Sequence, residues 1–146
     1  MTLYLDTSSL VKLYVAETDS EIVRQLVRDA TVVATSVVAY AEARAAFARL
    51  RRERVLTAAR LASTKSDFEA EWPTYLTLEV TDILCRAAGE LAETYGLRAF
   101  DGIHLASFAE VAHRAGPDDT RFSTFDGRLD QAARRLTRTL KRARRI

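Results

Sequence analysis

The chain has 146 residues, of which 48% are hydrophobic, and this is enough to build the core of one compact domain. A charged fraction of 29%, a net charge of +2, five glycines and two prolines exclude a disordered or low-complexity chain. No run is long enough to span a membrane, and the first residues do not resemble a signal peptide.

Four short runs of branched or aromatic residues predict strands, and longer runs with helical spacing separate them. The expected strands are residues 3–6, 32–35, 76–80 and 121–125. The expected helices are residues 9–17, 20–30, 37–55, 58–71, 82–95, 102–115 and 129–138. Ser20, Ser36 and Thr57 stand where capping side chains are expected, and Pro73, Gly96 and Gly116 stand where helices should end.

This alternation predicts one α/β domain over residues 1–146. Right-handed crossovers make the strands parallel in one sheet of four to five strands with helices on both faces, which is a three-layer sandwich. Ligands of such sheets bind beyond the carboxyl ends of the strands. Asp6 and Asp126 end the first and fourth strands, Ser36 follows the second, and Asp101 lies at a loop-to-helix junction.

The only cysteine, Cys85, excludes an intramolecular disulfide and a cysteine-based zinc site. It lies among apolar residues, so we expect it to be buried as a small hydrophobic side chain. Its single occurrence fits a protein of the reducing cytoplasm.

Residues 128–146 carry eight Lys or Arg and one acidic residue, Asp130, whereas residues 1–127 are net acidic. A basic tail, about residues 137–146, indicates contact with a polyanion or an acidic partner surface. A tail that only keeps the chain soluble is the alternative. A second basic cluster either extends this surface or is a solvated helix end; it comprises Arg49, Arg51, Arg52 and Arg54.

Four carboxylates are candidate site residues. Asp6, Asp101 and Asp126 lie where each can cap the following helix, which does not exclude a metal ion on the other carboxylate oxygen. Glu42 distinguishes better between capping and metal binding, because it lies two turns into a helix, where it cannot cap, among small apolar neighbours. A carboxylate there is costly unless a cation or a donor meets it. Its alternative is a half-exposed side chain paired with Arg49.

Gathering these carboxylates requires a counter-ion. Two unit charges about 4 Å apart repel by roughly 4 kcal/mol at an effective dielectric of about 20. Oxygen ligands without a cysteine or histidine cluster favour Mg²⁺ or Mn²⁺ over zinc. Such an ion keeps open positions for a phosphate and an attacking water.

Four segments carry these residues in order: LYLDTSSLVKLY, SVVAYAEARAAF, AFDGIHLASFAEV and FSTFDGRLDQAARRL. Through them the sequence resembles the PIN-domain ribonucleases over about residues 2–136, and within that family the VapC toxins. The resemblance implies that Asp6, Glu42, Asp101 and Asp126 bind the metal and carry catalysis. It also implies hydroxyl groups near the metal or phosphate at Thr7, Ser36 and Thr124, for which helix capping is an equal alternative.

The implied activity is metal-dependent hydrolysis of RNA phosphodiester bonds by an endoribonuclease, with transfer or ribosomal RNA as the expected class of substrate. The implied partners are a VapB-like antitoxin and a second copy in a homodimer, with no membrane. The competing hypothesis is a non-catalytic PIN-like module that binds RNA or a protein and uses the cation structurally. A complete acidic quartet favours the enzyme.

Two features limit the resemblance. The family usually has a glycine and a fifth strand after its last motif, whereas ARRLTRTLKRARRI has no glycine. Thr139 and Leu140 therefore either form a remnant of that strand or continue the helix. His104, one turn after Asp101, is expected to be a packed histidine and not an acid or base.

Overall fold

A parallel sheet in the strand order β3-β2-β1-β4 forms the centre of the computed structural model, which describes residues 1–144. The strands are β1 (Thr2–Leu5), β2 (Val32–Ser36), β3 (Leu76–Leu78) and β4 (Thr120–Ser123). Leu3 of β1 lies opposite Val33 of β2 and Arg121 of β4. The α/β class and the parallel sheet are therefore confirmed.

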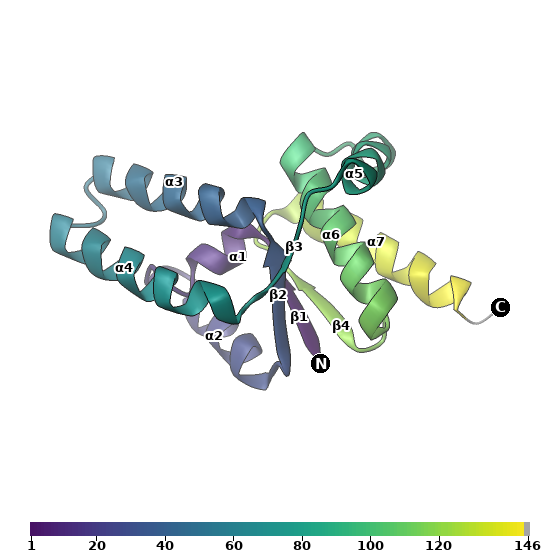
Figure 1. Ribbon diagram of the computed structural model, residues 1–146, viewed down its shortest axis with the longest axis horizontal. Coiled ribbons are helices and arrows are strands. Elements are labelled where there is room, and N and C mark those ends of the chain that lie inside the picture. The colour runs from purple at the N-terminus through teal and green to yellow at the C-terminus, as the bar shows by residue number, and fades with distance from the viewer. Residues whose placement is uncertain (145–146) are drawn as a thin grey trace.

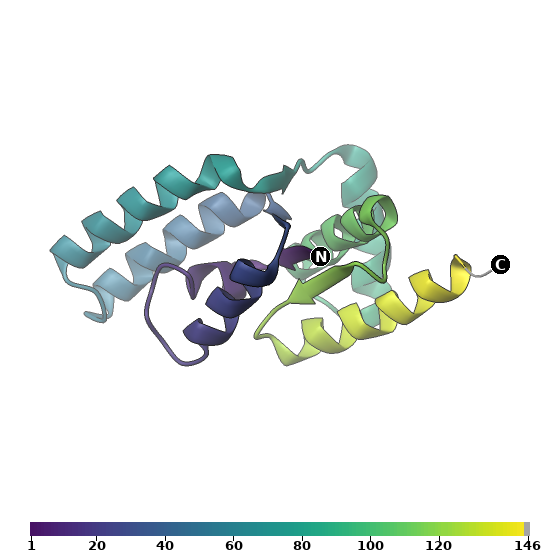
Figure 2. The same cartoon turned by 90° about the horizontal axis from the view of Figure 1, so that it is seen from below.

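Helices cover both faces of this sheet (Figures 1 and 2). On one side lie α1 (Thr7–Val11), α2 (Ser20–Asp29), α3 (Val38–Arg52) and α4 (Ala58–Glu71), and a 3₁₀ turn, η1 (Trp72–Thr74), follows α4. On the other side lie α5 (Asp82–Tyr95), α6 (Ala99–Ala115) and α7 (Gly127–Ala143). The result is the expected three-layer sandwich.

β1 connects the two cores because its side chains alternate between the faces of the sheet. Leu3 and Leu5 pack into the core that contains Phe47 and Phe68, which come from α3 and α4. Tyr4 points the other way, into a core built mainly by α6 and α7. All four residues of β1 are buried, which fixes the position of the residue that follows the strand.

The last helix decides between the two alternatives for Thr139 and Leu140 in favour of the continued helix. Thr139 and Leu140 belong to α7, which runs on to Ala143, and the described part of the sheet has four strands. The reason is helical spacing, since Leu129, Leu136 and Leu140 continue one apolar stripe against the core. Most of the basic tail is therefore helix, and residues 145–146 lie outside the described residues.

Three expectations need correction. Cys85 is exposed, because Leu84 and Ala88 are the residues of α5 that pack toward α6, and residue 85 lies on another face of the helix, in solvent. α1 begins at Thr7 and ends at Val11, since Asp6 caps it directly. α6 begins at Ala99, before the expected residue 102.

Among residues 1–144, none of the helices combines the length and the apolar character needed to cross a membrane.

α5 and α6 pack closely where Gly102 faces the α5 backbone. A Cβ at this position would lie 2.7 Å from the Ala88 carbonyl oxygen and 3.3 Å from the Ala92 Cβ. Gly89, also in a helix, has nothing within 4 Å of the equivalent position. The absence of a side chain at residue 102 therefore sets how near α6 approaches α5.

We expect Gly102→Ala to lower the free energy of unfolding by about 1–3 kcal/mol, because the added methyl group overpacks a backbone contact. Gly89→Ala is the matched control and should raise it by about 0.5–1 kcal/mol, because alanine has the higher helix propensity. Urea denaturation measures both. Equal effects at the two positions would contradict the close approach.

Candidate active site

A pocket of about 720 Å³ lies at the carboxyl ends of β1 and β4, and all four predicted carboxylates line it. Asp6 follows β1, Glu42 projects from α3, Asp101 from the first turn of α6, and Asp126 precedes α7. Cationic side chains line the same pocket; they are Lys12, Arg49, Arg52 and Arg98. The fold thus brings together acidic residues that are up to 120 positions apart in the sequence.

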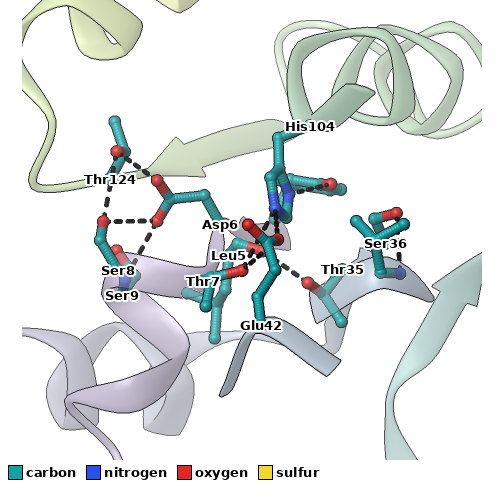
Figure 3. A network of polar contacts seen from close by, with 12 residues as sticks. Leu5, Asp6, Thr7, Ser8, Ser9, Thr35, Ser36, Glu42, His104 and Thr124 are labelled. Carbon is teal, nitrogen blue, oxygen red and sulfur yellow. Dashed lines mark hydrogen bonds and ion pairs between the residues drawn. The ribbon is translucent and has the colours of Figure 1, made fainter. Parts of the chain in front are cut away.

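Asp6 is only 4% exposed, and its carboxylate is held by three hydrogen bonds (Figure 3). Oδ1 accepts from the Ser9 amide at 3.0 Å and from the Ser8 hydroxyl at 2.7 Å. Oδ2 accepts from the Thr124 hydroxyl at 2.5 Å. Burial raises the pKa of Asp6, although these hydrogen bonds act in the opposite direction. Among residues 1–144, no lysine or arginine side chain forms an ion pair with this carboxylate, and hydroxyl and amide groups are its hydrogen-bond partners.

Glu42 lines the pocket and points toward Thr7 and His104, and its side chain is 32% exposed (Figure 3). Its Oε1 accepts from the Thr7 hydroxyl at 2.7 Å and lies 2.8 Å from Nε2 of His104. Burial acts to raise the pKa of Glu42, but the hydrogen bonds from His104 and Thr7 outweigh it and lower the pKa. The alternative pairing is wrong, because Arg49 lies near Glu53 instead.

His104 joins Glu42 to Tyr4. Its ring is 2% exposed, and Nδ1 lies 2.9 Å from the Tyr4 hydroxyl. Because the Glu42 carboxylate only accepts, Nε2 carries the hydrogen that it donates to Glu42, and Nδ1 of the neutral ring accepts from the Tyr4 hydroxyl. Burial raises the pKa of Tyr4 well above its ordinary value, which keeps this hydroxyl able to donate. His104 is the packed histidine that was expected, and it also orients Glu42, a role that the sequence did not indicate.

Arg98 connects the other two carboxylates. Its Nε lies 3.3 Å from Asp101 Oδ2, and its Nη2 lies 3.7 Å from Asp126 Oδ2. Because Arg98 is 81% exposed, each ion pair contributes less than about 1 kcal/mol. Asp126 also caps α7, since its Oδ1 accepts from the Leu129 amide at 2.9 Å. Asp101 lies inside the first turn of α6 and caps nothing, so the capping alternative is wrong for it.

The predicted hydroxyl residues divide into two groups. Thr7 and Thr124 contact Glu42 and Asp6, and Thr124 also accepts from the Asp126 amide at 3.1 Å. Ser36 is buried apart from these side chains, does not line the pocket, and accepts from the Val38 amide at 3.3 Å (Figure 3). Ser8 was not predicted, although it contacts Asp6; no sequence signal separates it from Ser9.

The donor chemistry of the pocket fits a hard divalent cation, because Glu17 and the four predicted carboxylates line it without cysteine. Within residues 1–144, however, no three acidic, histidine or cysteine side chains are gathered closely enough to hold a metal ion. Each of the four predicted carboxylates has partners of its own, namely hydroxyl groups for Asp6, His104 for Glu42, and Arg98 for the other two. Arg98 is the partner that an ion would displace, because it is largely exposed and pairs with both Asp101 and Asp126.

The sandwich, with an acidic pocket at the carboxyl edge of its parallel sheet, has the architecture of a PIN-like α/β protein. Comparison with known families agrees, since the PIN domain family matches residues 3–135. The chain belongs to the PIN-domain family, and within it to the VapC proteins.

Three relatives from Mycobacterium tuberculosis support this placement. Ribonuclease VapC49 of strain ATCC 25618 / H37Rv is 37% identical over 108 residues, which cover 74% of this chain and 75% of the relative. Ribonuclease VapC45 of strain CDC 1551 / Oshkosh gives the same values. Ribonuclease VapC46 of strain ATCC 25618 / H37Rv is 34% identical over 134 residues, which cover 92% of both chains.

We expect Asp6→Asn to increase the stability of the metal-free protein at neutral pH. A carboxyl group whose pKa is raised by folding favours the folded state below its unfolded pKa, and this contribution is lost as the pH rises through the folded pKa. At neutral pH the buried, ionised side chain therefore lowers the stability of the folded protein. Asparagine removes the negative charge and keeps a similar shape. The gain should shrink as the pH falls toward the unfolded pKa of aspartate, which is about 3.9, because the buried carboxyl group takes up its proton above that pH.

Urea denaturation in EDTA measures this effect. Asp67→Asn is the control, because Asp67 is exposed on α4 and its substitution should change the stability by less than about 0.5 kcal/mol. If the Asp6→Asn protein is less stable than the wild type at neutral pH, the hydrogen bonds to the carboxylate stabilise the fold by more than the burial of its charge costs.

Proposed function

We propose that this chain is a metal-dependent endoribonuclease that acts as the toxin of a toxin-antitoxin pair. The observation that carries the proposal is the convergence of Asp6, Glu42, Asp101 and Asp126 on one pocket in a chain of the PIN family. The names of its relatives support ribonuclease activity. Residues 1–146 act as one PIN domain in the cytoplasm.

Asp6, Glu42 and Asp101 are the proposed principal ligands of Mg²⁺ or Mn²⁺, and Asp126 completes the set. When bound, such an ion supplies a water of lowered pKa and a positive charge for the phosphate oxygens. The protein orients Asp6 through Ser8, Ser9 and Thr124. It orients Glu42 through Thr7 and His104. These partners limit side-chain rotation, which reduces the cost of assembling the site.

Cationic residues around the pocket suit a polyanionic substrate. Lys12, Arg49, Arg52 and Arg98 can contact RNA phosphates, which gives affinity but little sequence selection. Arg98 is well placed to exchange its two carboxylates for a phosphate because it is largely exposed. Transfer or ribosomal RNA is the proposed class of target, since selection of a site then depends on RNA shape and exposed bases.

We expect the purified protein to cleave cellular RNA in the presence of Mg²⁺ or Mn²⁺, and we expect this cleavage to stop when EDTA is added. Asp101→Asn should lower the cleavage rate by about 10²-fold or more while the protein stays folded, because the loss of a metal ligand removes several kcal/mol of transition-state stabilisation. Gel electrophoresis of the RNA and circular dichroism of the protein provide the two measurements.

Asp130→Asn is the matched control, since Asp130 pairs with Arg134 on α7 and does not line this pocket. Cleavage by Asp101→Asn at the wild-type rate would refute the assignment of the site. If the wild type cleaves nothing in a broad pool of cellular RNA, the non-catalytic RNA- or partner-binding module becomes the better description.

The proposed partners are a VapB-like antitoxin and a second copy of the chain. We expect a homodimer at micromolar concentration, measured by size-exclusion chromatography with light scattering, and a monomer there would contradict it. Expression of the chain alone should arrest growth, and co-expression of its antitoxin should relieve the arrest. An antitoxin arginine suits the acidic pocket because its planar guanidinium matches carboxylates.

A further inference from the structure

Phe125 is an exposed aromatic side chain at the rim of the acidic pocket. It is 40% exposed, and it lies between Thr124 and Asp126 in the turn from β4 to α7. Single exposed phenylalanines are common on protein surfaces and carry no functional meaning by themselves. What sets Phe125 apart is how firmly its backbone is attached to the proposed metal ligands.

The backbone of this turn is tied to Asp6 on both sides of Phe125. The Phe125 amide donates to Ser8 Oγ at 3.0 Å, and the same hydroxyl donates to Asp6 Oδ1. Thr124, the preceding residue, donates its hydroxyl to Asp6 Oδ2 and accepts from the Asp126 amide. The backbone that carries the ring is therefore fixed relative to Asp6.

The ring also has a cation on one face. Lys12 Nζ lies 4.6 Å from the ring centroid, and it donates to the Thr18 carbonyl oxygen at 2.8 Å. Lys12 lines the same pocket as Arg49, Arg52 and Arg98. Proteins bind single-stranded nucleic acid at surfaces where bases stack on exposed rings and nearby cations contact the backbone, and this pocket offers one such ring beside one lysine, with three arginines also lining it.

We infer that Phe125 stacks an unpaired base of the RNA beside the phosphate that lies in the acidic pocket, and that Lys12 contacts the backbone of that nucleotide. This inference rests on the proposed function and extends it to the selection of substrate. The base is unpaired because bases in a duplex are stacked on each other and offer no free face to a side chain. Phe125 is thus a binding residue that favours cleavage in single-stranded segments.

The test measures the binding of a short, fluorescein-labelled, single-stranded RNA of mixed sequence. Asp101→Asn serves as the background so that the RNA stays intact. We expect Phe125→Leu to weaken binding by about tenfold, which is the size of effect expected for the loss of one base–ring stack. Phe125→Tyr should bind like the parent because it keeps the ring. Duplex RNA of the same sequence should bind equally to all three proteins.

Phe100→Leu is the matched control, because Phe100 is 54% exposed in the first turn of α6 and does not line the pocket. In the active protein, Phe125→Leu should raise KM for single-stranded RNA and leave kcat nearly unchanged. Circular dichroism checks that the variants stay folded.

Equal binding of single-stranded RNA by the Phe125→Leu protein and its parent would overturn the inference. Loss of antitoxin binding without loss of RNA binding would also overturn it, because Phe125 would then belong to a protein interface. Neither result affects the proposed nuclease activity, which fails only if the wild type does not cleave RNA.

Discussion

The site depends on one buried carboxylate, that of Asp6, at the end of the central strand. Burying a charge is costly, and here three hydrogen bonds from Ser8, Ser9 and Thr124 offset part of the cost. Thr124 comes from the far end of the sequence, so the network holds the β4–α7 turn against the start of α1. The remaining cost leaves Asp6 able to gain from a cation.

A second network holds Glu42 from the opposite side of the sheet. His104 reaches across from α6, and Tyr4 of β1 orients the histidine ring through its hydroxyl group. The residues of β1 alternate between the two cores, so this strand serves both networks. Glu42 and Asp6 are therefore fixed by the packing of the whole domain, whereas Asp101 and Asp126 share an ion-pair partner in an exposed arginine. Asp6 and Glu42 thus form the rigid part of the pocket, and Asp101 and Asp126 form the adjustable part.

The sequence predicted the bounds of the strands to within one or two residues, because buried parallel strands are short apolar runs with Asp, Ser or Pro residues next to their ends. It predicted the extent of α4 and α5 correctly from their helical spacing, the Thr57 start of α4, and the Pro73 and Gly96 exits. It left the end of α7 open and was wrong about Cys85, because both outcomes depend on which helix face meets the core. Helical spacing extended α7 through Leu140, and no local residue marks its end.

The sequence by itself determined which carboxylates gather at the edge of the sheet, because Asp6 and Asp126 follow strands whose carboxyl ends meet there and Glu42 lies on an apolar helix face. It could not determine the partners of those carboxylates. Contacts such as Glu42 with His104, Asp6 with Thr124 and Arg98 with Asp126 join segments that are distant along the chain. Hydrogen bonds act over about 3 Å, so only the folded packing of the sheet and its helices decides which groups come within that distance.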